Sequence, residues 1–268
     1  MAGKSVGAAL VLVAVAASCS VFEDRMDCPC FLVVDYALVN DQAQRPTAEG
    51  RVHSLLYNPE CCGNITHMSI SCPDYDTIAC TKGEAVFSAI YSPGAVPLKS
   101  ARGVIEYGVG HEVDSIYGCH ESLSLLDEKQ YVTVTMHKQF STVQLIVKES
   151  DALVRGADLT LVGNSCGYDV TTFAPVTGEY RLELERDPSL VRSFRIPRQA
   201  DYSLTLHIER ASEGDSYDFP LGECLADIGY DFDVPDLSDF DVEIDLAKMT
   251  VLIKVLDWDR EYIVEVFD

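Results

Sequence analysis

Basic residues are scarce in this sequence. The 268 residues include 20 Lys and Arg against 43 Asp and Glu, which gives a formal net charge of −23 at pH 7. A surface of that sign repels phosphate backbones, so the sequence excludes nucleic acid as a partner. It also excludes attachment to anionic lipid through basic patches.

The spacings that mark common catalytic and metal sites are also missing. No C-x-x-C and no H-E-x-x-H occurs, so the usual zinc-ligand patterns are absent. Residues 163–167 (GNSCG) match G-x-S-x-G, but they lie between two strand-like runs, which favours a hairpin turn over the strand-to-helix turn of a hydrolase. The acidic stretch of residues 230–241 resembles a calcium loop only in its charge. We expect no enzymatic activity, no cofactor and no metal, with a weak surface Ca²⁺ site as the less favoured alternative.

The N-terminus carries the one long apolar run. Lys4 precedes an uninterrupted stretch of Gly, Ala, Val and Leu from Val6 to Ala17. This length is typical of a signal peptide and shorter than the ~20 residues needed to cross a bilayer. Small residues directly before Cys19 resemble the bacterial lipobox, in which that cysteine is acylated and becomes the new N-terminus. The sequence therefore predicts a lipoprotein signal peptide over residues 1–18, with a plain secretory signal as the alternative.

Acylation of Cys19 would fix the location of the chain. Each buried methylene contributes ~0.8 kcal/mol, so two or three acyl chains hold a protein stably on a membrane. The polar residues 19–27 would form a lipidated tether, and the acidic residues Glu23 and Asp24 resemble a surface-export signal of some Gram-negative bacteria. We expect an outer-membrane lipoprotein exposed at the cell surface.

The cysteines are concentrated in the N-terminal half, where seven of the ten precede residue 81. In an exported chain this pattern favours structural disulfides over a metal site. Nine cysteines remain besides Cys19, so at least one thiol stays free or pairs between molecules. The sequence leaves the connectivity open. The candidate disulfide residues are Cys28, Cys30, Cys61, Cys62, Cys72, Cys80 and Cys119.

Short strand patterns fill the rest of the chain, and helical periodicity is limited to residues 221–228. Residues 131–136 and 143–147 alternate apolar and polar side chains across a short break, which predicts a hairpin. About thirteen strands are too many for a single sandwich, and a polar stretch occupies residues 126–130. We therefore expect an all-β fold of two tandem β-sandwich domains, residues 28–128 and 129–268.

Five segments together resemble a known family. They are Cys28-Pro29 leading into a hydrophobic strand, residues 132–138 (VTVTMHK), residues 220–231 (PLGECLADIGYD), residues 236–245 (DLSDFDVEID) and residues 251–259 (VLIKVLDWD). The chain resembles the fimbrillin-associated anchor proteins of Bacteroidales fimbriae, minor subunits that tie a pilus to the outer membrane. The resemblance implies two transthyretin-like β-sandwiches in series, without enzymatic activity.

The resemblance also implies a partner, the pilin of the fimbrial shaft. Fimbrial subunits of this kind join by strand addition, in which main-chain hydrogen bonds link the chains. We expect the C-terminal segment 250–268 to contribute the pairing surface and to bound assembly of the filament. The simpler interpretation is that these strands complete the C-terminal sandwich. The candidate contact residues are Val251, Ile253, Val255, Trp258, Tyr262, Val264 and Val266.

Two other functions fit the same sequence. A fimbrial tip or accessory adhesin would show an exposed aromatic patch. A surface lipoprotein that binds glycans or nutrients would require a concave pocket between the two domains.

Overall fold

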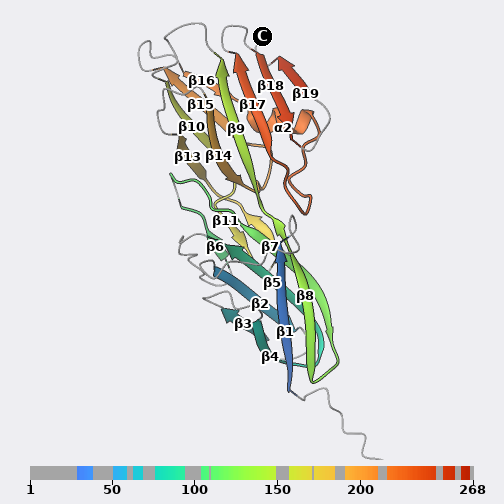
Figure 1. Ribbon diagram of the computed structural model, residues 1–268. Helices are drawn as coiled ribbons and strands as arrows, with labels where there is room; N and C mark the ends of the chain where they lie inside the picture. Colours follow the sequence, from blue (N-terminus) through green and yellow to red (C-terminus); the bar gives the residue numbers. More distant parts are fainter. Residues whose placement is uncertain are drawn as a thin grey trace, which may run out of the picture.

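The computed structural model describes twelve stretches of the chain and shows two lobes arranged end to end (Figure 1). The described residues are 29–38, 51–58, 63–68, 76–93, 104–108, 110–148, 157–170, 172–184, 191–210, 216–245, 250–256 and 261–265. Cys19, the signal peptide and the tether lie outside these ranges. Within them, no helix combines the length and the apolar character needed to span a membrane.

Seven strands build the N-terminal lobe, in the order β3-β2-β5-β7-β8-β1-β4. Strands β7 and β8 pair at only two register positions, so the sheet folds into two layers. One layer contains β1 (Pro29–Leu38), β4 (Asp76–Thr81) and β8 (Lys129–Lys138); the other contains β2 (Arg51–Asn58), β3 (Gly63–Met68), β5 (Gly83–Ser92) and β7 (Tyr117–Leu125). Strands β1 and β8 run parallel.

The core of this lobe follows from the two-residue period of its strands. In β1, Leu32, Val34 and Tyr36 point inward and are buried. Phe87 and Tyr91 of β5 face them from the other layer. Two layers enclosing one apolar cluster make a β-sandwich.

Two sheets form the C-terminal lobe. The five-stranded sheet has the order β14-β9-β17-β18-β19 and the four-stranded sheet the order β13-β10-β15-β16. The strands of the first are β14 (Val191–Pro197), β9 (Phe140–Lys148), β17 (Phe240–Asp245), β18 (Thr250–Val255) and β19 (Glu261–Glu265); those of the second are β13 (Tyr180–Leu184), β10 (Ala157–Gly163), β15 (Thr205–Arg210) and β16 (Ser216–Phe219). One apolar cluster lies between them. The expected all-β fold of two sandwiches is confirmed.

The predicted helical turns are present as α2 (Leu221–Asp227). Leu221, Cys224 and Leu225 bury one face of α2 in the C-terminal core. Gly222 is required at its position, since an added Cβ would lie 2.1 Å from the carbonyl oxygen of Tyr202. The backbone N–H of Gly222 also donates to Leu204 O at 2.7 Å, so the helix is held tightly against the 202–204 segment.

A small third sheet connects the lobes. Strand β11 (Gly167–Asp169) pairs with β6 (Val104–Glu106) on one side and β12 (Ala174–Val176) on the other. An apolar cluster beneath it combines residues of β2, β5, β6 and β11 with neighbouring segments: Leu55, Ile90, Ile105, Ile116, Tyr168 and Val170. The lobes are thus joined by packed side chains as well as by the backbone that passes from β8 in one lobe to β9 in the other.

The hairpin predicted from residues 131–136 and 143–147 is wrong. Strand β8 pairs with β1 in the N-terminal lobe, while β9 pairs with β14 and β17 in the C-terminal lobe. A single residue, Gln139, separates them. The expected boundary at residue 128 falls at the start of β8, so we propose to place it at Gln139.

The turn expected at residues 163–167 is not a hairpin either. It carries the chain from β10 in the four-stranded sheet to β11 in the connecting sheet. Ser165 is fully buried there. Its position between two strands is unlike the exposed strand-to-helix turn that a catalytic serine of this motif occupies.

Candidate subunit-contact edge

The C-terminal segment forms the last strands of the five-stranded sheet. Antiparallel pairing joins β17 to β18 and β18 to β19. In Figure 1 these strands lie in the upper lobe, whereas β1 begins at the far end of the lower lobe. The candidate contact segment is therefore remote from the end at which the N-terminal tether would join the fold.

Strand β18 supplies core side chains. Val251, Ile253 and Val255 have 0% of their surface exposed and belong to the C-terminal apolar cluster. These three side chains complete the sandwich, as in the simpler interpretation of the segment. They offer no surface to a partner while the lobe is folded.

Strand β19 is the outermost strand of the sheet, with β18 as its neighbour. Tyr262 is half-buried and packs against the core, and Val264 stands opposite Val251 in the register. Trp258 and Val266 lie outside the described residues. The side of β19 away from β18 is a sheet edge, the kind of surface onto which another strand can add.

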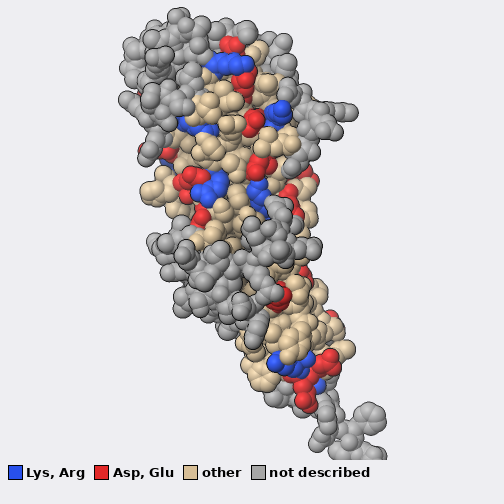
Figure 2. Space-filling view, in the orientation of Figure 1, with Lys and Arg blue, Asp and Glu red and all other residues tan. Residues whose placement is uncertain are grey.

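The outer face of this sheet carries alternating charges. Lys254 of β18 stands opposite Asp241 of β17, and Lys148 of β9 forms an ion pair with Glu243. Burial raises the pKa of Asp241, an effect that the nearby Lys254 ammonium opposes. On the view of Figure 2, basic and acidic side chains are interspersed over the described surface of the upper lobe. That mixture resembles a solvated sheet face more than a nucleic-acid site.

The chain crossing between the lobes is held by a buried guanidinium. Arg198 is 6% exposed, and its Nε donates to Gln139 Oε1 at 2.9 Å. Its Nη1 donates to Phe232 O, and its Nη2 donates to Val234 O at 2.7 Å and to Pro235 O at 3.1 Å. Gln139 Nε2 also donates to Pro235 O, at 3.2 Å. Arg198 thus fixes the crossing residue against the loop that follows α2.

Tyr168 completes this polar cluster. Its hydroxyl donates to Gln139 Oε1 at 3.1 Å and lies 3.2 Å from Phe173 O. Burial raises the pKa of Tyr168 to about 12, although the charge of Arg198 works in the opposite direction. The phenol therefore stays a neutral donor over the physiological range.

The acidic loop also contacts the chain crossing. Asp236 accepts from the backbone N–H of Lys138 at 2.7 Å and shares a hydrogen bond with His137 Nδ1 at 2.8 Å. Asp239 accepts from Lys138 Nζ and from the backbone N–H of Thr142, each at 2.5 Å. Two carboxylates of the stretch that resembles a calcium loop, Asp236 and Asp239, thus stabilise the segment around Gln139 where the chain passes between the lobes. No metal-binding group of His, Cys, Asp or Glu is found among the described residues.

In the structure, none of the cysteines in the described ranges is joined in a disulfide. Cys30 and Cys80 lie side by side, and Cys119 is buried in the same core. Cys166 and Cys224 belong to later segments, and Cys224 packs in the C-terminal core. The remaining candidates Cys28, Cys61, Cys62 and Cys72 lie outside the ranges that the structure describes.

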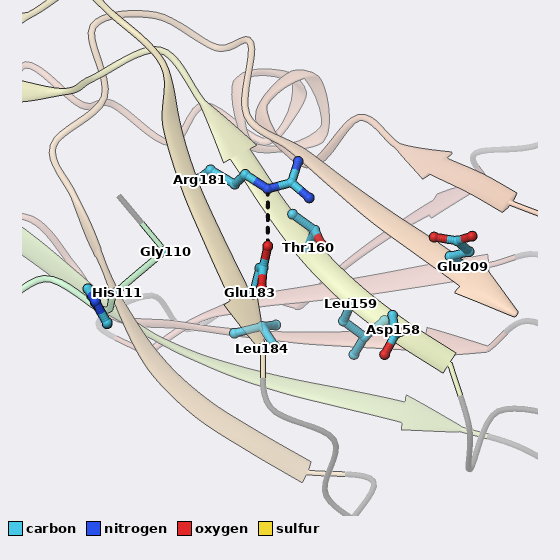
Figure 3. A pocket seen from close by; sticks show the side chains of 9 residues that line it. All are labelled: Gly110, His111, Asp158, Leu159, Thr160, Arg181, Glu183, Leu184 and Glu209. Atoms are coloured by element: carbon cyan, nitrogen blue, oxygen red, sulfur yellow. Dashed lines mark hydrogen bonds and ion pairs between the residues drawn. The ribbon is translucent and has the colours of Figure 1, made fainter. Parts of the chain in front are cut away.

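A hollow of about 590 Å³ opens on the outer face of β13, β10 and β15 (Figure 3). Arg181 and Glu183, both on β13, form an ion pair of 3.5 Å in its wall. The other lining residues include one imidazole, and no Trp, Tyr or Phe is among them: Gly110, His111, Asp158, Leu159, Thr160, Leu184 and Glu209. The hollow therefore lacks the aromatic platform expected of a glycan-binding site.

No known family model matches the sequence, and no curated protein matches it. Solved structures do match the fold. A candidate adhesin from Bacteroides thetaiotaomicron has a TM-score of 0.61 and 13% identity, with 89% of this chain and 98% of that one covered. A candidate polysaccharide-binding protein from the same organism has a TM-score of 0.61 and 12% identity over 88% of this chain and 98% of that one.

The fimbrial anchor protein Mfa2 from Porphyromonas gingivalis matches with a TM-score of 0.59 and 11% identity, covering 90% of this chain and all of that one. At these identities the likeness concerns the fold, and it extends over nearly the whole length of both chains. The resemblance expected from the sequence is confirmed at the level of structure: the chain has the two-lobed, all-β fold of Bacteroidales fimbrial anchor and adhesin proteins.

Proposed function

We propose that this protein is an outer-membrane lipoprotein that anchors a fimbria to the cell surface. The observation that carries the proposal is the position of the β19 edge. It lies in the lobe remote from the start of β1, so one end of the molecule serves the membrane and the other serves a partner subunit (Figure 1). The shared fold with a fimbrial anchor protein supports the same assignment.

The membrane end of the proposal rests on acylated Cys19. Residues 19–28 precede the first strand, and ten extended residues span at most roughly 36 Å. The N-terminal lobe would thus stand close to the bilayer on a short polar tether. The packed connecting sheet and the Arg198 cluster would then hold the C-terminal lobe in a defined position above it.

The partner end works by strand addition. A strand added along the five residues of β19 would form roughly five main-chain hydrogen bonds at most, each worth about 1 kcal/mol net. Main-chain pairing alone would therefore contribute about 5 kcal/mol, which is no more than the roughly 4–15 kcal/mol that association costs in lost translational and rotational freedom. Stable retention of a filament requires further burial of side chains from the incoming strand, and these would also determine which pilin binds.

The test is a deletion of residues 261–268 in the organism that makes the fimbriae. We expect the truncated lipoprotein to stay folded and membrane-bound, because the core side chains of β18 are retained, while fimbriae are released into the medium. The matched control is Val191→Lys, which alters β14 at the opposite edge of the same sheet. Cells whose truncated anchor still retains fimbriae would contradict the role of this edge.

The alternative of a tip or accessory adhesin has one observation on its side, a pair of exposed rings. Phe31 is 47% exposed and Tyr131 is 70% exposed, on the adjacent strands β1 and β8. Lys129 Nζ lies 5.0 Å from the centre of the Tyr131 ring. This pair lies near the start of β1, the end nearest the proposed tether, and is poorly placed to reach a distant host surface. Loss of host binding in Tyr131→Ala with fimbriae retained would favour the adhesin.

A further inference from the structure

Two cysteines in the N-terminal lobe are direct cross-strand neighbours. Cys30 of β1 and Cys80 of β4 are Cα partners in the antiparallel register. Their sulfur atoms are 3.1 Å apart, and the side chains are 1% and 6% exposed. This separation is shorter than an ordinary contact between two unbonded sulfur atoms.

The backbone positions already suit a bond between the sulfurs. Opposed residues in an antiparallel pair have Cα atoms about 4.5–5.5 Å apart, within the 4.4–6.8 Å that disulfides occupy. Closing the contact to the roughly 2.05 Å of a disulfide needs only small rotations of the two side chains. Cys166, by contrast, directs its sulfur to the carbonyl oxygens of Val176 and Thr177.

The surroundings of the pair argue against a reactive thiol. Both side chains belong to the apolar core of the N-terminal sandwich. Burial, reinforced by the hydrogen bond with Cys30, raises the pKa of the Cys80 thiol to about 12. Since the thiolate is the reactive form, a reduced pair would be inert once the lobe has folded.

We propose that Cys30 and Cys80 form a structural disulfide when the chain is exported and folds. The inference rests on the proposed export, because disulfides persist in oxidising compartments. The oxidant is a protein or small-molecule disulfide. One cysteine thiolate attacks it and releases one thiol, and the second thiolate then attacks the mixed disulfide and releases the other. The two protein thiols lose two protons and two electrons, and the oxidant disulfide becomes two thiols.

The bond would connect the first strand after the tether to an edge of the sheet. Strand β4 is the terminal strand of the N-terminal sheet and pairs with β1. A pull on the fimbria reaches the membrane through β1, so a covalent link between β1 and β4 would resist separation of these strands. It would also close a loop that contains β2 and β3.

The experiment maps the bond in protein from native outer membranes. The sample is denatured without reductant, its free thiols are alkylated, and it is cleaved with chymotrypsin, which separates Cys80 from the cysteines at 61, 62 and 72. We expect mass spectrometry to find the Cys80 peptide linked to the Cys30 peptide, with release by a phosphine reductant. Cys28→Ser should retain the link and Cys30→Ser should lose it. Free Cys30 and Cys80, or a link from Cys80 to another cysteine, would overturn the proposal.

A second arm separates this inference from the proposed function. Recombinant full-length chain is refolded with oxidised glutathione and mapped in the same way. The link should form in this sample whether or not the chain anchors a fimbria, so a Cys30–Cys80 link in protein that fails to retain fimbriae would contradict the proposed function alone. Failure of the recombinant chain to form the link overturns the pairing itself.

Discussion

Replacement of Arg198 by methionine should weaken the joint between the lobes. Methionine has a similar length but no donor, so Arg198→Met removes four hydrogen bonds to uncharged oxygens of Gln139, Phe232, Val234 and Pro235. A hydrogen bond of this kind contributes about 1 kcal/mol net, and more when the donor is charged. Relief of the desolvation of the guanidinium offsets part of the loss. We expect the free energy of unfolding to fall by about 3 kcal/mol.

The change is measurable as a shift in thermal stability. For a chain of this size, 1 kcal/mol corresponds to about 2–4 °C, so the unfolding midpoint should fall by about 6–12 °C. Calorimetry of the detergent-solubilised mature protein would measure the shift. The matched control is Arg181→Met, which removes a more exposed guanidinium whose ion pair with Glu183 spans 3.5 Å; exposed pairs contribute roughly 0–1 kcal/mol.

The comparison of the two variants tests whether the buried Arg198 cluster stabilises the contact between the lobes. If Arg198→Met shifts the midpoint no more than Arg181→Met does, the buried cluster does not hold the lobes together. The proposal that the Arg198 cluster holds the two lobes in a fixed relative position would then lose its physical basis.

Three further predictions concern the packing of Gly222 and Ile253 and the buried phenol of Tyr168. Gly222→Ala should lower the free energy of unfolding by about 2 kcal/mol, because the added methyl group overpacks against the 202–204 segment. The control is Gly108→Ala, whose added Cβ would lie 3.6 Å from the nearest atom, in the His111 side chain. Chemical denaturation should find this control nearly neutral. Ile253→Ala should cost about 2–5 kcal/mol because the side chain is fully buried, and Leu256→Ala, 53% exposed in wild type, should cost far less by the same assay. The raised pKa of Tyr168 favours its protonated form in the folded state, so its contribution to stability is complete below about pH 10 and is lost as pH rises toward 12. Phenolate absorbance should therefore lag behind that of the unfolded chain, and Tyr168→Phe should reduce the alkaline loss of stability; a lag and an alkaline loss both unchanged in that variant would contradict the assignment.

Strand content could be predicted from the sequence wherever side chains alternate cleanly. Val132, Val134 and Met136 in β8, and Val251, Ile253 and Val255 in β18, show the two-residue period, and most of these side chains are fully buried. The helical turns of α2 were also predictable from their apolar spacing. Both signals are local, and local periodicity survives folding when one face is buried.

The sequence does not reveal the strands in which the alternation of apolar and polar side chains is weaker. Strand β7 (YGCHESLSL) buries Cys119, Leu123 and Leu125 but carries polar residues at most other positions. Strand β14 (VRSFRIP) buries Phe194 and Ile196 between arginines and ends in a proline. Each reads as a loop because its apolar set is small, and only the partner strand makes it a strand.

The strand pairing and the contacts between the two lobes cannot be predicted from the sequence, for a different reason. The parallel register that sets Phe31 opposite Lys129 joins residues far apart in the chain, and no local pattern records it. Arg198 lies in a short IPRQ segment that resembles a turn, and its role depends on carbonyl groups of the 232–235 loop. The cross-strand contact of Cys30 and Cys80 likewise required the register of β1 and β4.

The most direct test of the anchor is the distribution of fimbrial subunits between cells and culture fluid when Cys19 is replaced by alanine. The proposal predicts that Cys19→Ala moves the fimbriae into the medium, because the acyl group is the membrane attachment. Fimbriae that stay cell-bound at the wild-type level in this variant would contradict it.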